Sequence, residues 1–555
     1  MTPTARTSTA FISAAVLFAV SACSSQGASD TDHGTIIIDA PAGPIQGLTL
    51  DGLELFRGIP FAAPPVGDAR WAPPTRLAAW QETLDATEFR SACMQPGQSA
   101  ASIYSDTLQP MSEDCLNLNI WAPANADQAP VFVWIHGGSL TRGANSQALY
   151  DGSSYAERGI VFVSINYRLG ILGYLAHPEL SAESPDDVSG NYGLLDQVAA
   201  LQWVEENIAA FGGDPDTVTI AGESAGALSV TYLMASPLAH GLFDRAIAQS
   251  AYTLSTPELR QARFGAPSAE AMGVFVANTL GAAGIAELRA MDAGSLVEAT
   301  ATTGYIPWGT IDGVVLPDQL VTLFDRGEQA PVPVLAGFNE GEIRSLRFLL
   351  PQPPADAGAY EAAIRNGYGD LAATALELYP STDLEESMLA TTRDAMYGWT
   401  AERLVRKQTE LGQPSYLYFN DHGYPAADGM GLHAFHASEL PYMFDNLDRL
   451  SPQWPAPPHT EAERALASAM IDYWSSFARN GAPGAAGQPD WQAYGDREAY
   501  MYFSAAPQGD EVNLMSGMFE LHEAVMCRRR AGNVGWHWNV GIAAPSLPPQ
   551  IPECP

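Results

Sequence analysis

Basic residues are scarce in this chain. Its 555 residues include 27 Lys and Arg against 63 Asp and Glu, which gives a formal net charge of −36. A nucleic-acid-binding protein needs a basic surface to offset phosphate repulsion, so this class of function is excluded. The acidic excess suits a solvated surface that keeps the protein soluble, and steering of cationic substrates is the second interpretation.

Long hydrophobic runs are also missing. The longest apolar stretch, residues 10–22, is too short to span a bilayer, and it follows Arg6, as in the apolar segment of a signal peptide. It ends in Val-Ser-Ala-Cys at residues 20–23, which resembles a bacterial lipobox. We therefore expect residues 1–22 to be a signal peptide. Residues 23–33 would be a polar tether lipidated at Cys23, which anchors an exported protein to a membrane of the cell envelope. The alternative is ordinary signal cleavage, which would give a periplasmic or secreted protein with a free Cys23.

Cysteine is rare, and no Cys-x-x-Cys motif or histidine cluster accompanies it, which disfavours a metal site. Without Cys23, four of the five cysteines remain, and an even number in an exported chain predicts disulfides. The four are Cys93, Cys115, Cys527 and Cys554.

Repeats, low-complexity tracts and linker-like breaks in composition are absent as well. The hydrophobic content of 46% is ordinary for a globular protein. We expect residues 34–555 to form one large domain, including a Pro-rich C-terminal tail, because α/β domains often exceed the average domain length.

One turn carries the strongest signal that is present. Residues 217–226 read Thr-Val-Thr-Ile-Ala-Gly-Glu-Ser-Ala-Gly, a β-branched strand that runs into a Gly-x-Ser-x-Gly turn and then an apolar stretch. This arrangement is typical of the nucleophile elbow of α/β-hydrolases, in which the glycines let strand and helix approach closely. The pattern predicts that Ser224 is exposed beyond the sheet as the nucleophile that forms an acyl-enzyme.

Acyl transfer also needs hydrogen-bond donors for the developing oxyanion, and a glycine pair earlier in the chain could supply them. Residues 130–135 are a strong predicted strand and lead into His136-Gly137-Gly138-Ser139. Adjacent glycines allow backbone N–H groups to approach a substrate oxygen that a Cβ atom would block. We expect the N–H groups of Gly137, Gly138 and Ala225 to form an oxyanion hole.

Candidates for the acid and the base follow two predicted strands further along, residues 332–337 and 415–419. Active groups in open α/β sheets lie beyond the carboxyl ends of strands, and elbow hydrolases have the order serine, acid, histidine. The first strand is followed by Glu340 and Glu342, and the second by His422, His433 and His436. The residue types alone do not choose between Glu340 and Glu342, or between His433 and His436.

Several segments before the elbow carry a family resemblance. They are residues 56–62 with 64–67, then 112–121, 166–170, 191–197 and 207–215. With them the chain resembles the type-B carboxylesterases, the family of cholinesterases and para-nitrobenzyl esterases, from about residue 34 to about residue 502. The resemblance implies an α/β-hydrolase fold. Its central sheet would be mostly parallel and flanked by helices, with large loop and helix insertions over the active site.

The resemblance also implies roles for single residues. In the family the acid lies five residues beyond the glycine that ends its strand, which leads from Gly337 to Glu342, although the neighbours of Glu342 depart from the usual Asp-Glu-Gly. The family base opens a His-Gly-x-Glu-Leu-Pro-Tyr-x-Phe block, which residues 436–444 match except that Ala437 replaces glycine. His436 is therefore the expected base. Glu223 resembles the family's elbow glutamate, and it either supports the site by its charge or is a structural carboxylate.

Other implications concern the loops. Cys93 and Cys115 match the first bridge of the family, which leaves Cys527 to pair with Cys554 and to fix the C-terminal tail. Tyr305 and Trp308 fall in a region that lines the acyl pocket of relatives and are candidate pocket residues. The choline-binding tryptophan of relatives lies in the first disulfide loop, and residues 94–114 contain no tryptophan.

The sequence thus predicts an exported, lipid-anchored hydrolase of small carboxylic esters that needs no metal or organic cofactor. Hydrolysis of amides, carbamates or polyester natural products by the same residues is the nearest alternative, because the leaving group and the pocket decide among them. A non-catalytic cell-surface binding protein is the alternative from another class. Such family members typically lack one or more of the three catalytic residues, all of which are found here.

Overall fold

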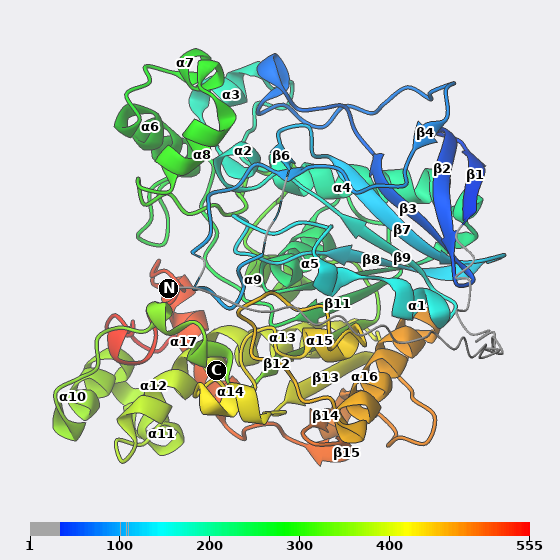
Figure 1. The fold of residues 1–555 in the computed structure, drawn as a ribbon. Helices are drawn as coiled ribbons and strands as arrows, with labels where there is room; N and C mark the ends of the chain where they lie inside the picture. Colours follow the sequence, from blue (N-terminus) through cyan, green and yellow to red (C-terminus); the bar gives the residue numbers. More distant parts are fainter. Residues whose placement is uncertain (1–33, 100, 107, 109, 555) are drawn as a thin grey trace, which may run out of the picture.

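The computed structural model describes residues 34–554 except 100, 107 and 109. The expected signal peptide, residues 1–22, and the expected tether, residues 23–33, lie outside the described residues. A large twisted sheet runs through the molecule with helices on both faces (Figure 1). Its strand order is β1-β2-β3-β7-β9-β8-β10-β11-β12-β13-β14-β15, and β4 pairs with β2.

The central strands of this sheet, from β9 to β14, are parallel, and both edges are antiparallel. This arrangement confirms the expected α/β-hydrolase architecture. The strands are β1 (Gly34–Ala40), β2 (Gly43–Leu50), β3 (Leu53–Pro60), β4 (Leu84–Asp85), β7 (Asn117–Pro123), β8 (Ala129–Ile135), β9 (Val161–Ile165), β10 (Gly213–Glu223), β11 (Arg245–Gln249), β12 (Val334–Asn339), β13 (Ser415–Asn420), β14 (Ala499–Phe503) and β15 (Pro507–Val512). A separate pair consists of β5 (Ala92–Cys93) and β6 (Met111–Ser112).

The central strands are apolar throughout because both of their faces are covered. Along β8, Val131 and Val133 belong to the core on one face of the sheet, whereas Phe132 and Trp134 belong to the core on the other. This division follows from the two-residue period of a strand. The first core includes helices α4, α5, α9, α13 and α17, and the second includes α1, α15 and α16.

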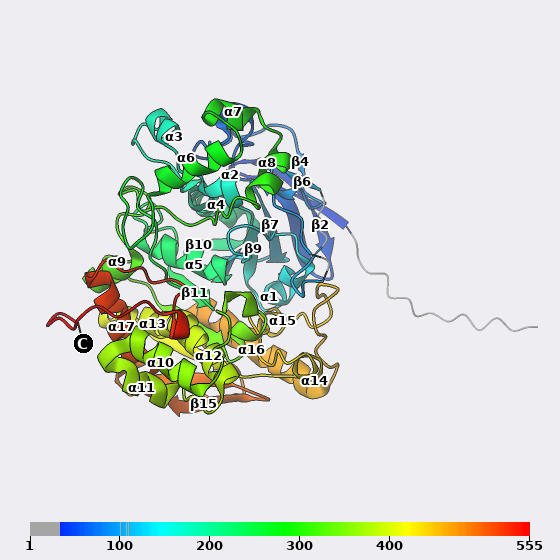
Figure 2. The same cartoon turned by 90° about the vertical axis from the view of Figure 1, so that its left-hand side faces the viewer.

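Two groups of helices are inserted between the parallel strands. Helices α6 to α8 follow β11, α10 to α12 follow β12, and the two groups lie at opposite ends of the molecule in both views (Figures 1 and 2). The helices are α1 (Ser153–Glu157), α2 (Gly170–Tyr174), α3 (Pro178–Glu183), α4 (Tyr192–Asn207), α5 (Ala225–Ala235), α6 (Ala269–Thr279), α7 (Ile285–Ala290), α8 (Ala293–Thr300), α9 (Leu320–Arg326), α10 (Ala357–Tyr368), α11 (Ala372–Leu378), α12 (Leu384–Arg393), α13 (Trp399–Glu410), α14 (Pro425–Gly429), α15 (Leu440–Met443), α16 (Glu461–Asn480) and α17 (Met518–Ala531).

Two disulfides connect segments outside the sheet core. Cys93 is bonded to Cys115, and Cys527 to Cys554, the same pairings that the sequence predicts. The first closes the loop between β5 and β7, and the second ties the end of the chain back to α17. Among the helices that the structure describes, none has the length and apolar character needed to cross a membrane.

Candidate active site

The turn from β10 into α5 has the geometry of the predicted elbow. Ser224 joins the two elements with φ 56° and ψ −121°, a backbone conformation that residues other than glycine rarely adopt. A Cβ atom on Gly222 would lie 2.4 Å from the carbonyl carbon of Gly226, and one on Gly226 would lie 2.1 Å from the oxygen of Ile135. Both glycines are therefore required sterically, and their presence forces Ser224 to the top of the turn.

The predicted glycine loop lies directly against this turn. A Cβ atom on Gly137 would be 3.3 Å from the Cβ of Ser224 and 2.7 Å from the carbonyl oxygen of Glu223. No described residue accepts a hydrogen bond from the N–H of Gly137 or Gly138. Ala225 is the first residue of α5, where N–H groups have no partner within the helix. The structure thus brings the three expected donors to one place.

The predicted base and acid are in contact. The Nδ1 atom of His436 is hydrogen-bonded to Oε2 of Glu342, and both side chains are buried. The other oxygen of Glu342 accepts hydrogen bonds from the hydroxyl of Ser250 at 2.6 Å and from the N–H of Asn339 at 2.8 Å. These contacts fix the carboxylate of Glu342 in a position from which it can orient the imidazole.

The second nitrogen of His436 faces Glu223. Its Nε2 atom lies 3.1 Å from Oε1 of Glu223, and no hydrogen bond joins Ser224 to His436 among the described residues. Catalytic hydrogen bonds are often long or poorly aligned before substrate binds. The absence of a bond between Ser224 and His436 therefore does not argue against a catalytic pair. Glu223 is the nearest anionic neighbour of the imidazole on this side.

Burial and charge act against each other on these groups. Burial alone would lower the pKa of His436, but the carboxylates of Glu223 and Glu342 outweigh it and raise this pKa. Burial raises the pKa of Glu223, and the charge of His436 opposes that effect. The charges of both carboxylates therefore favour the protonated form of the imidazole.

Sequence reasoning missed most residues that support the acid and the base. Glu439 is fully buried, and its two oxygens accept hydrogen bonds from Gln249 at 3.0 Å and from Asn339 at 2.5 Å. Tyr104, from the loop closed by the first disulfide, donates to the carbonyl oxygen of His436 at 2.9 Å. Ser250 could have been found from the sequence, because it directly follows β11, a short buried strand, and active groups lie beyond such strand ends. No feature of the sequence pointed to Tyr104.

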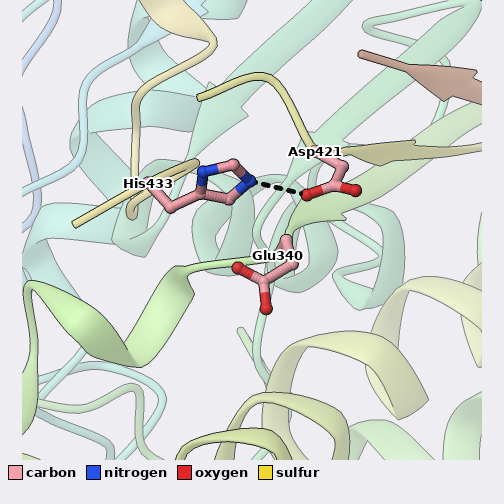
Figure 3. Close-up of side chains that lie close together, drawn as sticks. All are labelled: Glu340, Asp421 and His433. Atoms are coloured by element: carbon pink, nitrogen blue, oxygen red, sulfur yellow. Dashed lines mark hydrogen bonds and ion pairs between the residues drawn. The ribbon is translucent and has the colours of Figure 1, made fainter. Parts of the chain in front are cut away.

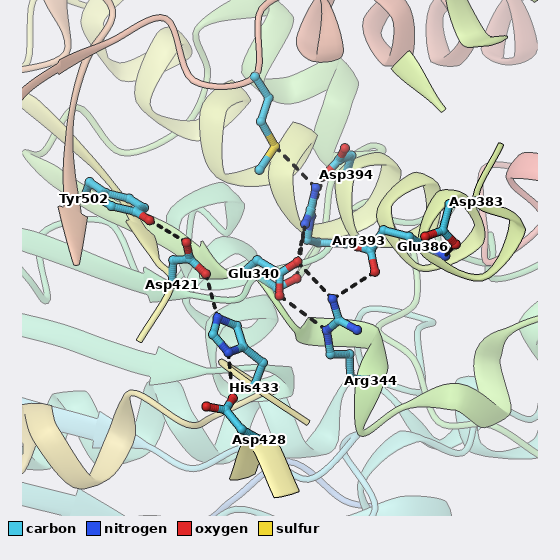
Figure 4. A network of polar contacts seen from close by, with 11 residues as sticks. Glu340, Arg344, Asp383, Glu386, Arg393, Asp394, Asp421, Asp428, His433 and Tyr502 are labelled. Carbon is cyan, nitrogen blue, oxygen red and sulfur yellow. Dashed lines mark hydrogen bonds and ion pairs between the residues drawn. The ribbon is translucent and has the colours of Figure 1, made fainter. Parts of the chain in front are cut away.

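The two alternative candidates, Glu340 and His433, lie in a different cluster. Ligand-type atoms of Glu340, Asp421 and His433 all lie within 4.8 Å of one another (Figure 3). His433 contacts Asp421 through Nε2 at 2.9 Å and Asp428 through Nδ1 at 2.8 Å. Two arginines, Arg344 and Arg393, bind Glu340 (Figure 4).

This cluster fits an ion-pair network better than a metal site. The hydrogen bond to Asp421 raises the pKa of His433 to about 9, and the bond to Asp428 adds to this effect against the opposing effect of burial. A histidine that binds a metal must be neutral, whereas this one is charged at neutral pH and has both nitrogens occupied. The network joins the segment that carries Glu342 to the one that carries His436, as does the hydrogen bond from Gly341 to Ala434 at 2.7 Å.

The two candidate pocket residues, Trp308 and Tyr305, pack on different hydrophobic clusters. Trp308 packs on the main core, with its ring 6.3 Å from that of Tyr252. Tyr252 lies 6.0 Å from Tyr397, whose ring is 5.4 Å from the imidazole of His436. Tyr305 packs instead on a third cluster, formed by α2 and α6 to α8. A chain of aromatic contacts therefore leads from Trp308 to the base.

Comparison with known proteins gives a consistent result. The family model described as "Carboxylesterase family" matches residues 34–519. The fumonisin B1 esterase of Sphingopyxis macrogoltabida is 36% identical over 86% of this chain and 88% of its own length. The para-nitrobenzyl esterase of Bacillus subtilis is 35% identical over 82% of this chain and 92% of its own. A solved PNB esterase structure superposes with a TM-score of 0.76 at 32% identity, covering 87% of this chain and 99% of the other.

Ala437 departs from the glycine of the family block, and the structure explains why glycine is suited to this position. Ala437 has φ 69°, in the left-handed region, and is buried beside His436. Holding an alanine there costs on the order of 1 kcal/mol, because its Cβ crowds the following carbonyl oxygen. Ala434, in the same segment and also buried, has no such strain.

We therefore expect Ala437→Gly to leave the free energy of unfolding unchanged or to raise it. The relief of strain offsets the greater chain entropy of glycine in the unfolded state. The matched substitution Ala434→Gly relieves no strain and should lower that free energy by about 1 kcal/mol. Denaturant unfolding of both variants checks the expectation, and equal destabilisation would show that Ala437 is not strained.

Proposed function

The chain belongs to the carboxylesterase family and is a carboxylic-ester hydrolase, and we propose that Ser224, His436 and Glu342 are its catalytic triad. The observation that carries this assignment is the buried contact between Glu342 and the imidazole of His436. Ser224, Glu342 and His436 follow the carboxyl ends of three parallel strands, β10, β12 and β13, at one edge of the sheet. Glu340, the alternative acid, is engaged by two arginines instead.

The proposed reaction proceeds through an acyl-enzyme. The hydroxyl oxygen of Ser224 attacks the ester carbonyl while Nε2 of His436 accepts the hydroxyl proton. Glu342 holds Nδ1–H and stabilises the imidazolium that forms. His436 then gives the proton to the leaving alcohol, and afterwards it removes a proton from the water that cleaves the acyl-enzyme.

The N–H groups of Gly137, Gly138 and Ala225 form the proposed oxyanion hole. Their lack of acceptors in the described part of the chain supports this role, because a donor that is already paired could not stabilise a developing negative charge. The sheet and helix hold these donors in place before the substrate arrives, so little reorganisation is needed during the reaction.

Glu223 has an electrostatic role in this proposal. Its carboxylate lies 3.1 Å from Nε2 of His436, the atom that must exchange a proton with Ser224. A negative charge at this distance stabilises the imidazolium that forms as Ser224 attacks. The same charge raises the pKa of His436 in the free enzyme, and only the deprotonated imidazole can accept the proton of Ser224.

We assign the acyl group of the substrate to the aromatic wall next to the base. Support comes from the contacts that lead from Trp308 through Tyr252 and Tyr397 to His436. Tyr305 is not given this role because its contacts belong to the third cluster. Small-molecule esters are the proposed substrate class, and hydrolysis of amides, carbamates or polyester natural products by the same residues is the alternative.

We also propose that residues 1–22 are a signal peptide and that Cys23 is lipidated, with residues 23–33 as a tether and residues 34–555 as one exported domain. The two disulfides support export, since such bonds form in oxidising compartments. Attachment would be to a membrane of the bacterial cell envelope, through acyl chains.

Ser224→Ala should lower ester turnover by at least about 10⁴-fold while the fold is retained, because the nucleophile is lost. A fluorophosphonate probe followed by peptide mapping should label Ser224 in the wild-type protein and nothing in the variant. Ser236→Ala is the matched control, since Ser236 is a buried serine at the C-terminal end of α5 and its hydroxyl has no partner in the described chain. Near-normal turnover by Ser224→Ala would refute the mechanism.

Glu342→Gln and Glu340→Gln form a pair that tests the acid. Loss of the Glu342 charge should lower kcat by roughly 10³-fold or more, because the imidazolium loses its stabilising carboxylate. Glu340→Gln should change kcat by less than about tenfold, since Glu340 only supports the neighbouring network. Steady-state kinetics with thermal unfolding of both variants makes the comparison, and the reverse ranking would move the acid to Glu340.

Cys23→Ser should move the exported protein from the membrane fraction to the soluble fraction, because the residue that carries the acyl chains is removed. Fractionation of a bacterial host, with metabolic labelling by a fatty-acid analogue, is the measurement. Membrane retention of the variant at the wild-type level would contradict lipid anchoring at this residue.

A further inference from the structure

The C-terminal tail lies beyond the family match, which ends at residue 519. After α17 the chain folds back over its own domain, and the disulfide between Cys527 and Cys554 closes it into a loop. The tail carries Trp536 and Trp538. This segment therefore lies outside the part of the chain that matches the family model, and a disulfide holds its end to α17.

Trp536 anchors the tail next to the strand that follows the elbow helix. Its carbonyl oxygen accepts from the N–H of Ser255 at 2.9 Å, and its N–H donates to the Ser255 hydroxyl at 2.8 Å. Its buried indole lies 5.2 Å from that of Trp399, and the guanidinium of Arg529 lies over it at 5.4 Å. These contacts leave little freedom to the residues on either side.

The residues after Trp538 are fixed as well. The side chain of Asn539 accepts hydrogen bonds from Arg529 at 3.2 Å and from the N–H of His537 at 3.0 Å. Val540 is buried, and the N–H of Gly541 donates to the hydroxyl of Tyr368 at 3.1 Å. Trp538 thus sits between two anchored points.

The indole of Trp538 meets the aromatic wall of the proposed acyl site. Its ring lies 5.6 Å from that of Tyr252 and 6.0 Å from that of Tyr397. Tyr397 in turn is 5.4 Å from the imidazole of His436. Tyr252 and Tyr397 are buried, whereas Trp538, like Trp308 at the other end of this wall, is half-buried and keeps an open face.

We propose that Trp538 is a specificity-determining residue that closes the outer end of the acyl pocket, so that the disulfide-closed tail limits the size of the acyl group. The inference rests on the proposed triad and on the assignment of the acyl group to the wall beside His436. A rigid indole is well suited to this role because it covers a large apolar area at a small cost in conformational entropy.

The expected effect follows from what an apolar pocket can discriminate. One methylene in such a pocket changes kcat/KM by roughly 10-fold to 200-fold, since it is either accommodated or excluded. Removing the indole should therefore favour long acyl chains over short ones, whereas a residue that only stabilises the fold would change the rates for all esters by the same factor.

The test compares Trp538→Ala with wild type on p-nitrophenyl acetate, butyrate and octanoate, and on butyrate esters of alcohols of increasing size. The ratio of kcat/KM for octanoate to that for acetate should rise by about tenfold or more. The dependence on alcohol size should not change. Trp538→Phe, which keeps an aromatic ring, should give an intermediate ratio.

Trp80→Ala is the matched control. Trp80 is also half-buried, but its indole N–H donates to the carbonyl oxygen of Pro44 on β2, at the opposite edge of the sheet from β13, which precedes His436. Its loss should leave the ratio as in wild type. An unchanged ratio in Trp538→Ala, a decrease that grows with acyl length, or a change confined to the alcohol series would overturn the proposal.

The double variant Cys527→Ser/Cys554→Ser tests the contribution of the closed tail. Loosening the tail should raise the octanoate-to-acetate ratio, as Trp538→Ala does, and an unchanged ratio in this folded variant would remove the disulfide from the proposal.

Fluorophosphonate labelling of Ser224 is measured in parallel. Failure of wild type to react with the probe or to cleave any ester would refute the proposed triad, whereas intact labelling with unchanged selectivity would refute only the role of Trp538.

Discussion

The turn between β10 and α5 has room for a hydrogen atom, but not for a methyl group, at Gly222 and Gly226. The helix can follow the strand so closely only because these side chains are absent, and the chain must then pass through the strained conformation of Ser224. Such a conformation costs about 1–3 kcal/mol and persists only when the surroundings determine it. Here they do, because β10 is buried between β8 and β11 and α5 is buried along its whole length. The positions of Ser224, which we propose as the nucleophile, of the N–H groups of Gly137 and Ala225, and of Glu223 all depend on this one steric constraint.

A second constraint is the burial of several carboxylates near one imidazole. Glu223, Glu342 and Glu439 are all buried within reach of His436, and burial of carboxylates is costly unless each is paired or hydrogen-bonded. Glu342 and Glu439 have partners for both oxygens, whereas Oε1 of Glu223 has no hydrogen-bond partner and relies on the charge of His436. The incompletely paired carboxylate is thus the one next to Ser224, the proposed nucleophile. The remaining carboxylates are held in place so that the imidazole has one orientation.

The features that could be predicted from the sequence are those with a local cause. The elbow and the glycine loop can be recognised in the sequence because their steric requirement must be met by residues that are neighbours in the chain. Composition could not choose between Glu340 and Glu342, since both follow the same strand; the difference is that Arg344 and Arg393 reach one of them and His436 the other. The contacts of Tyr104 and Trp538 could not be predicted at all, because each joins segments more than 100 residues apart. The φ angle of Ala437 is a partial case: the family block indicated an unusual residue, but not that the backbone there is left-handed.

Both disulfides act on the surroundings of His436, although neither touches it. The first closes the loop that carries Tyr104, which binds the carbonyl oxygen of His436, and the second closes the tail that places Trp538 against Tyr397. Closing a loop of this size stabilises the folded state by about 3 kcal/mol in the chain-entropy account, because fewer open conformations remain. In the tail, the hydrogen bonds between Trp536 and Ser255 and between Gly541 and Tyr368 add to this covalent closure. The sheet accounts for the position of the proposed reacting groups, whereas the loop and the tail beside them are also tied by two covalent bonds that form only under oxidising conditions. The proposed export of the enzyme would meet that requirement, and this would link the cysteine content of the chain to its proposed substrate site.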